Sequence, residues 1–345
     1  MITVKQLDFD GDTNAWDNYV MENGGSSVFH LAGWGRSVNK SMGHDLYNLY
    51  AEKDGKVCGI LPLTHIKSKL FGNSLVSVAF SVGGGPLFDD EETLAALDVE
   101  AKKIADSLGV EAMEYRQINK CHSDWPLKAE TYSTFRKELS SDNEENMLAI
   151  PRKQRAMVRK GIKFELCYEI DTDINRFFHL YSTSVRNLGT PVFPKALFKA
   201  LKNEFGEDCE ILTVTTSEGE AISSVMSFYF KEEIIPYYGG GGLSARNYAA
   251  NDFMYWSLME HAVTERGVRI FDFGRSKNGT GAFSFKKNWG FEATPLEYEY
   301  YLRSGDEIPE VNPLNPKYQL MIKTWRKLPL GIANTIGPFI SKSLG

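Results

Sequence analysis

The chain has 345 residues, of which 42% are hydrophobic and 24% are charged, and its formal net charge is −6. This length and composition suit two globular domains with apolar cores of their own, so disulfide staples are unnecessary. An acidic chain is not a general nucleic-acid-binding protein, although a local basic patch can still hold phosphates.

The first half reads as helices, a hairpin, a third strand, a helix and a further strand. Residues 29–34 open a helix, in which His30 and Trp34 are candidates for packing or for contact with a substrate. Apolar alternation and turn residues then predict this order: strand 46–52, turn 53–56, strand 57–66, strand 75–80 with glycines at 83–85, helix 91–108 ended by Gly109, and strand 110–117.

A polar stretch at 140–146 separates the halves and precedes a strongly basic segment. Residues 151–163 hold six positive side chains and no acid, and Pro151 and Gly161 bracket a short helix. Within it, Arg152, Arg155 and Arg159 share one face, beside Lys153. Concentrated positive charge suits the phosphates of a tRNA end, a coenzyme or an anionic lipid. The alternative interpretation is a solvated helix that keeps the linker soluble.

The second half repeats the order of the first. Its predicted elements are strand 210–216, turn 217–220, strand 221–230, strand 233–238 with glycines at 239–242, helix 249–266 ended by Gly267, and strand 268–273. Landmarks of the two halves recur at nearly constant offsets. Gly83 and Gly239 lie 156 positions apart, Glu114 and Asp272 lie 158 apart, and the hairpin residue Gly55 lies 164 before its counterpart.

These matches predict a duplicated unit. A hairpin, a third strand with a glycine-rich end, a helix and a further strand are typical of an acyltransferase of the GNAT type. We therefore predict an α+β fold with two tandem GNAT-like domains, at 1–146 and 147–303. Residues 304–345 form a C-terminal extension that we expect to pack back on the N-terminal domain.

The glycine run at 239–242 is a candidate donor-binding loop. Glycines let a backbone approach a ligand closely, and free amides before a helix bind anions. Tyr237 and Tyr238 precede the run, and Arg246 adds a fork for phosphate or carboxylate. Asp252 follows early in the helix, either as a functional carboxylate or as a complement to the helix dipole. An ordinary flexible turn is the alternative for the run.

The loop after the last predicted strand is a second candidate site. Asp272 alternates with two phenylalanines, so it faces away from them. Arg275 follows in a glycine-rich loop, and Lys286 lies within an aromatic run that includes Phe285. We interpret most of these aromatic residues as core packing, and Lys286 and Arg275 as functional.

Arg186 ends another predicted helix, where it either grips an anionic substrate or caps its own helix. The apolar stretch 328–340 is too short to span a bilayer, and Lys323, Arg326, Lys327 and Lys342 flank it. It either packs against the first domain or touches an anionic membrane surface. The start of the chain lacks a secretion-signal pattern, so we expect a cytoplasmic protein, with the inner face of the membrane as a further option. Four scattered cysteines and six unclustered histidines predict no metal.

Several motifs together resemble the FemAB-type proteins associated with exosortase and PEP-CTERM systems. They are PRKQRAMVRK at 151–160, the segment 186–194, PYYGGG at 236–241, FDFGRSK at 271–277, FKKNWGF at 285–291, IPEVNPLNPKY at 308–318 and WRKLPL at 325–330. The resemblance covers nearly the whole chain. The wider Fem family carries two GNAT-like domains, and its characterised members add amino acids from aminoacyl-tRNA to a peptidoglycan precursor.

The resemblance also implies roles for single residues. Phe285 and Lys286 match an aromatic–lysine pair that contacts the terminal nucleotide of the donor and stabilises charge at the reacting ester. Trp34, Arg186 and Tyr238 match residues that line the precursor pocket. The exosortase-associated branch is linked to exopolysaccharide export. The resemblance therefore implies the class of reaction but does not identify the substrate.

The expected chemistry is attack by an amine on an activated carbonyl. Lys286 is the candidate cation for the oxyanion, and Asp272 or Asp252 can take the ammonium proton. The donor, a co-substrate rather than a tightly bound cofactor, is aminoacyl-tRNA, and the acceptor is a nucleotide- or lipid-linked envelope precursor. An acyl-CoA-dependent N-acyltransferase of an exopolysaccharide amino sugar is the alternative, although the usual coenzyme A signature is missing before helix 249–266. A non-catalytic binding protein on the same scaffold is the third hypothesis.

Overall fold

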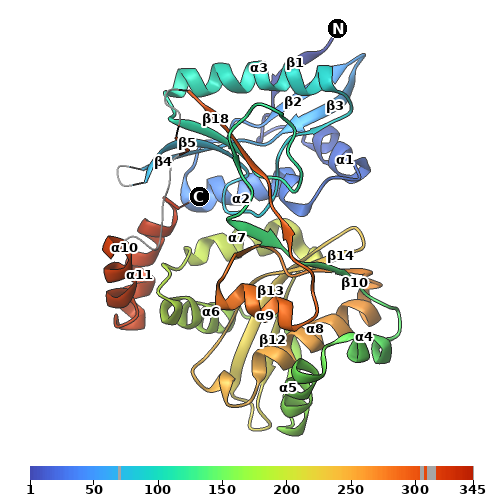
Figure 1. Cartoon of the computed structure of the whole chain (residues 1–345), viewed down its shortest axis with the longest axis vertical. Helices are drawn as coiled ribbons and strands as arrows, with labels where there is room; N and C mark the ends of the chain where they lie inside the picture. Colours follow the sequence, from blue (N-terminus) through green and yellow to red (C-terminus); the bar gives the residue numbers. More distant parts are fainter. Residues whose placement is uncertain (69–70, 304–306, 309–315, 345) are drawn as a thin grey trace. The chain divides into compact units, whose positions relative to one another are not determined.

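The computed structural model describes residues 1–68, 71–303, 307–308 and 316–344 (Figure 1). The chain forms two compact units. The first comprises Met1–Glu130, Pro295–Asn312 and Phe339–Gly345, and the second comprises Thr131–Thr294 and Pro313–Pro338. The expected boundary at residue 304 and most of the motif at 308–318 lie outside the described residues.

The first unit holds two sheets. One has the order β1(Thr3–Gln6), β2(Leu49–Lys53), β3(Lys56–Leu61), β6(Leu87–Phe88), and the other has the order β4(Thr64–Ser68), β5(Gly72–Ser77), β7(Ala112–Tyr115), β18(Tyr298–Leu302), β8(Leu127–Lys128). The expected single strand 57–66 is therefore wrong. The chain breaks between β3 and β4 at Pro62, which has no N–H for a ladder, and β4 joins the second sheet.

Helix α3(Glu91–Leu108) of the first unit has the predicted bounds. The Asp90 carboxylate accepts a hydrogen bond from the Thr93 amide at 2.8 Å, which caps its start, and Gly109 ends it with a φ of 61°. The helix packs closely on β3, because a Cβ at Gly59 would lie 2.5 Å from the Thr93 methyl group. The remaining helices of this unit are α1(Asn14–Glu22), the 3-10 turn Val28–His30 and α2(Ala32–Met42).

The second unit is built on one six-stranded sheet. Its order is β10(Arg136–Glu138), β15(Ile270–Asp272), β14(Glu233–Gly241), β13(Ala221–Phe230), β12(Cys209–Thr215), β11(Cys167–Asp171). All neighbours are antiparallel except β14 and β15. A short ladder joins β9(Tyr132–Thr134) to β16(Ser276–Lys277). Its α-helices up to residue 294 are α4(Asn143–Ala149), α5(Arg152–Lys163), α6(Ile174–Leu188), α7(Lys195–Phe205), α8(Ala250–Arg266) and α9(Gly281–Asn288).

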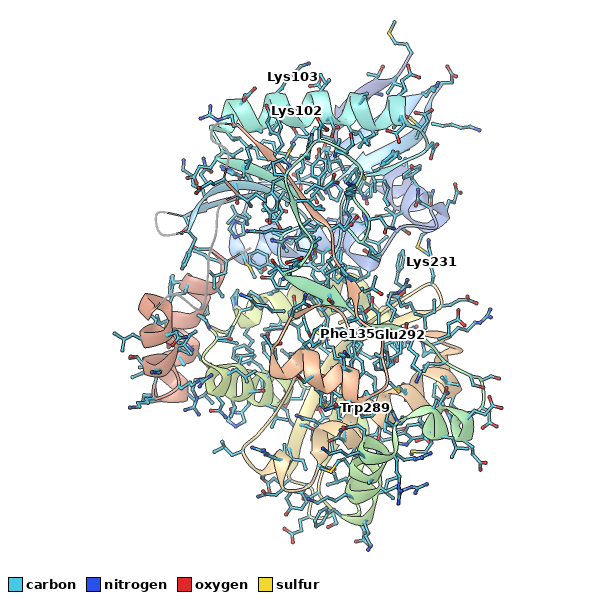
Figure 2. The ribbon with its side chains drawn as sticks, in the orientation of Figure 1. Lys102, Lys103, Phe135, Lys231, Trp289 and Glu292 are labelled. Carbon is cyan, nitrogen blue, oxygen red and sulfur yellow. The ribbon has the colours of Figure 1, made fainter. Side chains whose placement is uncertain are left out.

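Helices α6 and α8 cover opposite faces of this sheet. A Cβ at Gly239 would lie 3.5 Å from the Tyr255 hydroxyl of α8, whereas a Cβ at Gly240 would lie 2.4 Å from Ser184 of α6. Consecutive residues of a strand point to opposite faces, so the two contacts place the helices on different sides. The core below α8 includes the fully buried Phe135 and Trp289 (Figure 2).

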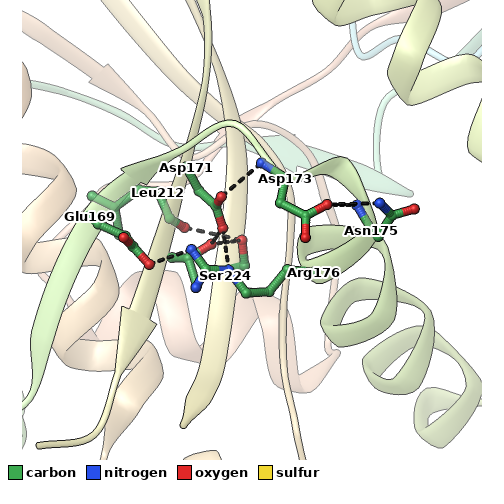
Figure 3. A network of polar contacts seen from close by, with 8 residues as sticks. Glu169, Asp171, Asp173, Asn175, Arg176, Leu212 and Ser224 are labelled. Carbon is green, nitrogen blue, oxygen red and sulfur yellow. Dashed lines mark hydrogen bonds and ion pairs between the residues drawn. The ribbon is translucent and has the colours of Figure 1, made fainter. Parts of the chain in front are cut away.

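A polar network around the buried Asp171 anchors the start of α6 to the sheet (Figure 3). The Asp171 carboxylate accepts hydrogen bonds from Arg176 Nε at 2.6 Å and from Thr213 Oγ1 at 2.9 Å. Arg176 also pairs with Glu169, and the Asp173 carboxylate caps the helix by accepting from the Asn175 amide at 2.8 Å. Because Asp171 is almost completely buried, its arginine partner is what permits it to stay charged.

Each unit completes its sheet with a strand from the other half of the sequence. Strand β10 pairs with β15, with Arg136 opposite Asp272, and β18 pairs with β7, with Tyr300 opposite Glu114. Residues 131–146 therefore lie in the second unit and residues 295–302 in the first, unlike the expected division at 146 and 303. Strand character is visible in a sequence, but the partner of a strand is not.

The C-terminal segment forms α10(Pro316–Trp325) and α11(Leu330–Ser341). These helices lie mostly in the second unit, against α6, and not in the first unit as expected. Two contacts hold them there. A Cβ at Gly189 would lie 2.5 Å from Ile322, and Asn334 Nδ2 donates to Ser182 Oγ at 3.2 Å. The last residues do return to the first unit, where the Lys342 carbonyl lies 2.8 Å from His44 Nε2.

Candidate active site

The second unit contains a point at which two parallel strands separate. Strands β14 and β15 are paired only at Glu233 with Ile270 and at Ile234 with Phe271, and β14 then continues to Gly241 beside β13. The ladder of β13 and β14 shifts register between Met226 and Ser227, so that Tyr237 is an extra residue on β14. A bulge at the point where strands diverge leaves backbone groups outside the ladder, and such points commonly hold active sites.

Lys286 belongs to α9, and its side chain extends back to the loop that follows β15. Its ammonium donates to the carbonyl oxygens of Phe273, Gly274 and Arg275 at 2.6, 2.9 and 3.1 Å. These three bonds use all three N–H groups, so in this state Lys286 fixes the loop after β15. Burial lowers the pKa of Lys286 to about 8, against the opposing attraction of Asp272.

Asp272 faces away from the core, as alternation predicts, while Phe271 and Phe273 are buried. Its carboxylate accepts from the Gly274 amide at 2.6 Å and from Thr134 Oγ1 at 3.2 Å. Burial raises the pKa of Asp272, and its hydrogen bonds to Gly274 and Thr134, together with the positive charge of Arg136, oppose this shift.

Sequence reasoning missed a second carboxylate in this cluster. Glu233 and Asp272 share Arg136, which pairs with Glu233 and lies 3.6 Å from Asp272. Burial and the negative charge of Asp272 raise the pKa of Glu233 to about 7. A carboxylate with a pKa near neutrality suits proton transfer, so Glu233 joins Asp272 as a candidate base. No motif marks Glu233; only the register of β14, β15 and β10 brings the three residues together.

Asp252 is enclosed by side chains of two neighbouring segments. It is buried in the first turn of α8, and its carboxylate accepts from Gln154 of α5 and from Trp289 Nε1 at 3.1 Å. Burial raises its pKa, and these two hydrogen bonds oppose the shift. The carboxylate therefore joins α5, α8 and the end of α9 inside the unit, and its role as a base stays a prediction.

Phe285 and Arg275 both contact aromatic rings of the second unit. The ring centroid of Phe285 lies 5.7 Å from Tyr255 and 6.1 Å from Trp289, so the residue packs against the core while remaining partly exposed. The Arg275 guanidinium lies 4.5 Å from the centroid of Tyr132, a cation–π distance. Tyr132 belongs to β9, and it too was missed from the sequence.

The glycine run is part of a strand and not a loop. Gly239, Gly240 and Gly241 belong to β14 and pair with Val225, Ser224 and Ser223. The missing side chain of Gly240 gives α6 room to approach the sheet. The expectation of a free glycine-rich loop is corrected accordingly, because three of the four glycines are strand residues and the tight packing of α6 requires Gly240. Arg246 lies beyond them in the 3-10 turn Ser244–Arg246 and is exposed.

The basic helix α5 packs on α8 through a narrow face. Gln154, Val158 and Gly161 are buried, and a Cβ at Gly161 would lie 2.7 Å from Phe253. The cationic side chains lie on the other faces; they are Arg152, Lys153, Arg159, Lys160 and Lys163, which are exposed, and Arg155, which is partly exposed. Arg159 also lines a surface pocket of about 410 Å³ with Trp256 and Glu260.

The candidate residues for the acceptor are distributed over both units. In the second unit, Arg186 Nη1 donates to the carbonyls of Arg326 and Leu328 at 3.4 and 3.3 Å, and Tyr238 packs against Tyr181 with ring centroids 5.9 Å apart. Within the described residues, the buried Arg186 Nε and Tyr238 hydroxyl have no hydrogen-bond partner. Tyr237 is partly exposed at the bulge.

In the first unit, Trp34 and His30 are core residues. Trp34 is fully buried, and its Nε1 donates to the Ala79 carbonyl at 3.3 Å. The ring nitrogens of His30 lie 3.0 Å from the Ser27 amide and 3.1 Å from the Gly85 carbonyl. Both side chains are occupied by packing and local hydrogen bonds, which accounts for them as core residues, and their contact with a substrate stays a prediction.

Comparison with known proteins adds a domain family and a fold. Residues 149–287 match the model of an acetyltransferase (GNAT) domain. This segment lies within the second unit and contains the diverging strands, and the match confirms the predicted transferase. A search of curated proteins gave no match.

Solved structures with the same fold cover most of the chain. FemX has a TM-score of 0.66 at 17% identity, covering 93% of this chain and 100% of its own. The C-terminal domain of a putative lysylphosphatidylglycerol synthetase from Agrobacterium fabrum has a TM-score of 0.59 at 13% identity, covering 86% and 93%. A tandem GNAT protein from the clavulanic acid biosynthesis pathway has a TM-score of 0.58 at 10% identity, covering 89% and 100%. The predicted tandem GNAT-like fold is thereby confirmed.

Proposed function

We propose that this protein transfers an aminoacyl group from aminoacyl-tRNA to an amine of a cell-envelope precursor and forms an amide. The amine attacks the ester carbonyl, the bond from the carbonyl carbon to the ribose oxygen breaks, and the proton of the attacking nitrogen passes to a base. The ribose oxygen takes up a proton and leaves as a hydroxyl of the deacylated tRNA. The Glu233–Asp272 pair is the candidate base, because the pKa of Glu233 is about 7. The resemblance to FemAB-type proteins of exosortase systems supports peptidoglycan or exopolysaccharide as the class of precursor.

The choice of donor rests on one observation, which is that α5 packs on the start of α8. Helix α8 begins at Ala250, and the preceding residue, Ala249, makes no side-chain hydrogen bond that caps the helix. The first backbone amides of α8 are therefore suited to bind an anion. Helix α5 crosses this end through Gln154 and Gly161 and extends its cations over about 18 Å. Positive charge spread over that length fits a polyanion such as an RNA stem better than one coenzyme pyrophosphate.

Donor binding tests this proposal directly. The change Arg152→Ala/Arg155→Ala/Arg159→Ala is expected to weaken binding of an aminoacylated RNA minihelix and to lower the slope of log affinity against log salt by roughly two to three. The control changes three exposed lysines of the first unit: Lys40→Ala, Lys56→Ala and Lys103→Ala. An unchanged affinity and slope in the arginine variant would show that α5 is a solvated helix.

An acyl-CoA-dependent N-acyltransferase of an amino sugar is the second candidate function. The observation in its favour is the match of residues 149–287 to an acetyltransferase domain. Acetyl-CoA binding, measured by thermal shift beside the RNA titration, separates the two. Stabilisation by acetyl-CoA without RNA binding would replace the first proposal by the second.

A further inference from the structure

The outward surface of α10 and α11 is unusually apolar. Five large apolar side chains of these helices are exposed: Leu320 (68%), Met321 (48%), Ile332 (46%), Ile336 (43%) and Phe339 (69%). In α11 they recur at i, i+4 and i+7, so they form one stripe along the helix. We call these five residues the C-terminal apolar surface. It lies outside the proposed active site, and its role is independent of the identity of the donor.

The opposite side of α11 explains why the large side chains point outward. Ala333 and Gly337 are buried, and a Cβ at Gly337 would lie 3.0 Å from the Val192 amide nitrogen. Asn334 donates to Ser182 of α6. These contacts of the helix are made by small and polar residues, whereas an amphipathic helix on a globular core usually packs through large apolar residues.

The charge of this segment is also unlike that of the whole chain. Residues 316–345 contain five positive side chains and no acid, although the net charge of the protein is −6. Lys323, Arg326, Lys327 and Lys342 are all exposed. Arg326 is also fixed to the unit, since its guanidinium donates to the Leu188 carbonyl at 3.1 Å.

Apolar side chains beside cations, on helices too short to cross a bilayer, match one kind of surface. In the described residues, no helix is long and apolar enough to span a membrane. An anionic bilayer accepts the apolar stripe among its acyl chains and the lysines among its headgroups. An RNA would leave the stripe in water, and a second copy of this chain would bring the same positive charges together.

We propose that the C-terminal apolar surface docks this protein on an anionic phospholipid membrane, with α10 and α11 lying along the interface. The bonds from Arg186 to the carbonyls of Arg326 and Leu328 tie the docking surface to the GNAT domain. A lipid-linked acceptor would then be met at the surface to which the enzyme is bound.

Vesicle co-sedimentation of the full-length chain tests the proposal. The probe is a set of phosphatidylcholine vesicles with and without phosphatidylglycerol, an anionic lipid that gives the vesicle a negative surface potential. The variant is Ile332→Ser/Ile336→Ser/Phe339→Ser, and the control is Met21→Ser/Val99→Ser, which removes exposed apolar side chains from α1 and α3 of the first unit. All five positions are exposed, so folding is expected to be retained, and thermal unfolding verifies it.

Wild type and control should bind the phosphatidylglycerol vesicles, and the α11 variant should bind on the order of 10²-fold more weakly. Binding of wild type should also weaken with salt. Absence of wild-type binding would overturn the proposal, as would equal binding of the α11 variant, which would indicate α5 instead. A concentration-dependent dimer of wild type, abolished in the α11 variant and accompanied by no vesicle binding, would assign the surface to a second copy.

Discussion

The substitution Gly240→Ala separates two explanations for the glycine run. Gly240 of β14 is paired with Ser224 of β13, and α6 packs against Gly240. An added Cβ would lie 2.4 Å from Ser184 Cβ and 3.4 Å from Tyr181 Cα. Carbon atoms in contact normally lie about 3.5–4.0 Å apart, so α6 has to move by roughly 1 Å. If the glycine exists for packing, this movement costs stability; if it exists for a ligand, the cost appears in binding.

We expect Gly240→Ala to lower the free energy of unfolding by about 1–3 kcal/mol, the usual cost of overpacking. Urea denaturation measures it, and hydrogen exchange of the α6 amides localises it. The matched control is Gly242→Ala, where the nearest atoms would lie 3.7 Å away and the expected change is within about 0.5 kcal/mol. Removing the opposing Cβ with Ser184→Gly should restore much of the loss, less about 1 kcal/mol for glycine in a helix.

Two outcomes would refute the packing explanation. Gly240→Ala could be as stable as wild type, which would mean that α6 yields without cost. Alternatively, Gly240→Ala and Gly242→Ala could both lose affinity for the donor at unchanged stability, which would restore the run as a ligand-binding backbone.

The other predictions concern three titratable groups. Lys286→Met leaves three carbonyl oxygens without their ammonium partner. Urea denaturation should therefore show a free energy of unfolding lower by about 2–4 kcal/mol, and the rate of transfer should fall by on the order of 10²–10³-fold. The control Lys287→Met changes an exposed neighbour and should alter neither quantity. The pKa of Glu233 rises from 4.5 to about 7 on folding. The free energy of unfolding should therefore fall as the pH rises through that interval, by at most about 1.4 kcal/mol per pH unit. The variant Glu233→Gln should remove this component of the pH dependence. Burial lowers the pKa of His122, but hydrogen bonds to Asp98 and Glu299 outweigh this effect and raise the pKa to about 9. The stabilisation from the protonated His122 should be complete below pH 6.5 and lost as the pH rises through 9. An identical profile of stability against pH in His122→Gln would contradict this prediction.

The sequence identified α3, α8 and the hairpin of β12 and β13 because their signals are local. The bounds of α3 follow from a capping aspartate, an apolar periodicity and a terminal glycine, all within one segment. The same holds for α8, predicted at 249–266 and observed at Ala250–Arg266, and for the hairpin of β12 and β13. The recurrence of this order in the two halves by itself predicts a duplicated GNAT-like fold.

The sequence also placed Asp272 and Lys286 near one strand end, because both are tied to β15 by short separations along the chain. It did not indicate that the Lys286 ammonium binds three carbonyls, nor that Asp252 is enclosed by Gln154 and Trp289. Those facts depend on side chains whose directions are set by the packing of α9 and α5.

Contacts between distant segments were decided only by the tertiary structure. Strands β10 and β18 complete sheets far from their neighbours in sequence, and the Glu233–Arg136–Asp272 cluster exists only because three strands meet in one register. Local propensity fixes where a strand begins and ends, whereas its partner is chosen by burial of the whole sheet. The site therefore depends on the register of the sheet, which periodicity in a single segment does not specify.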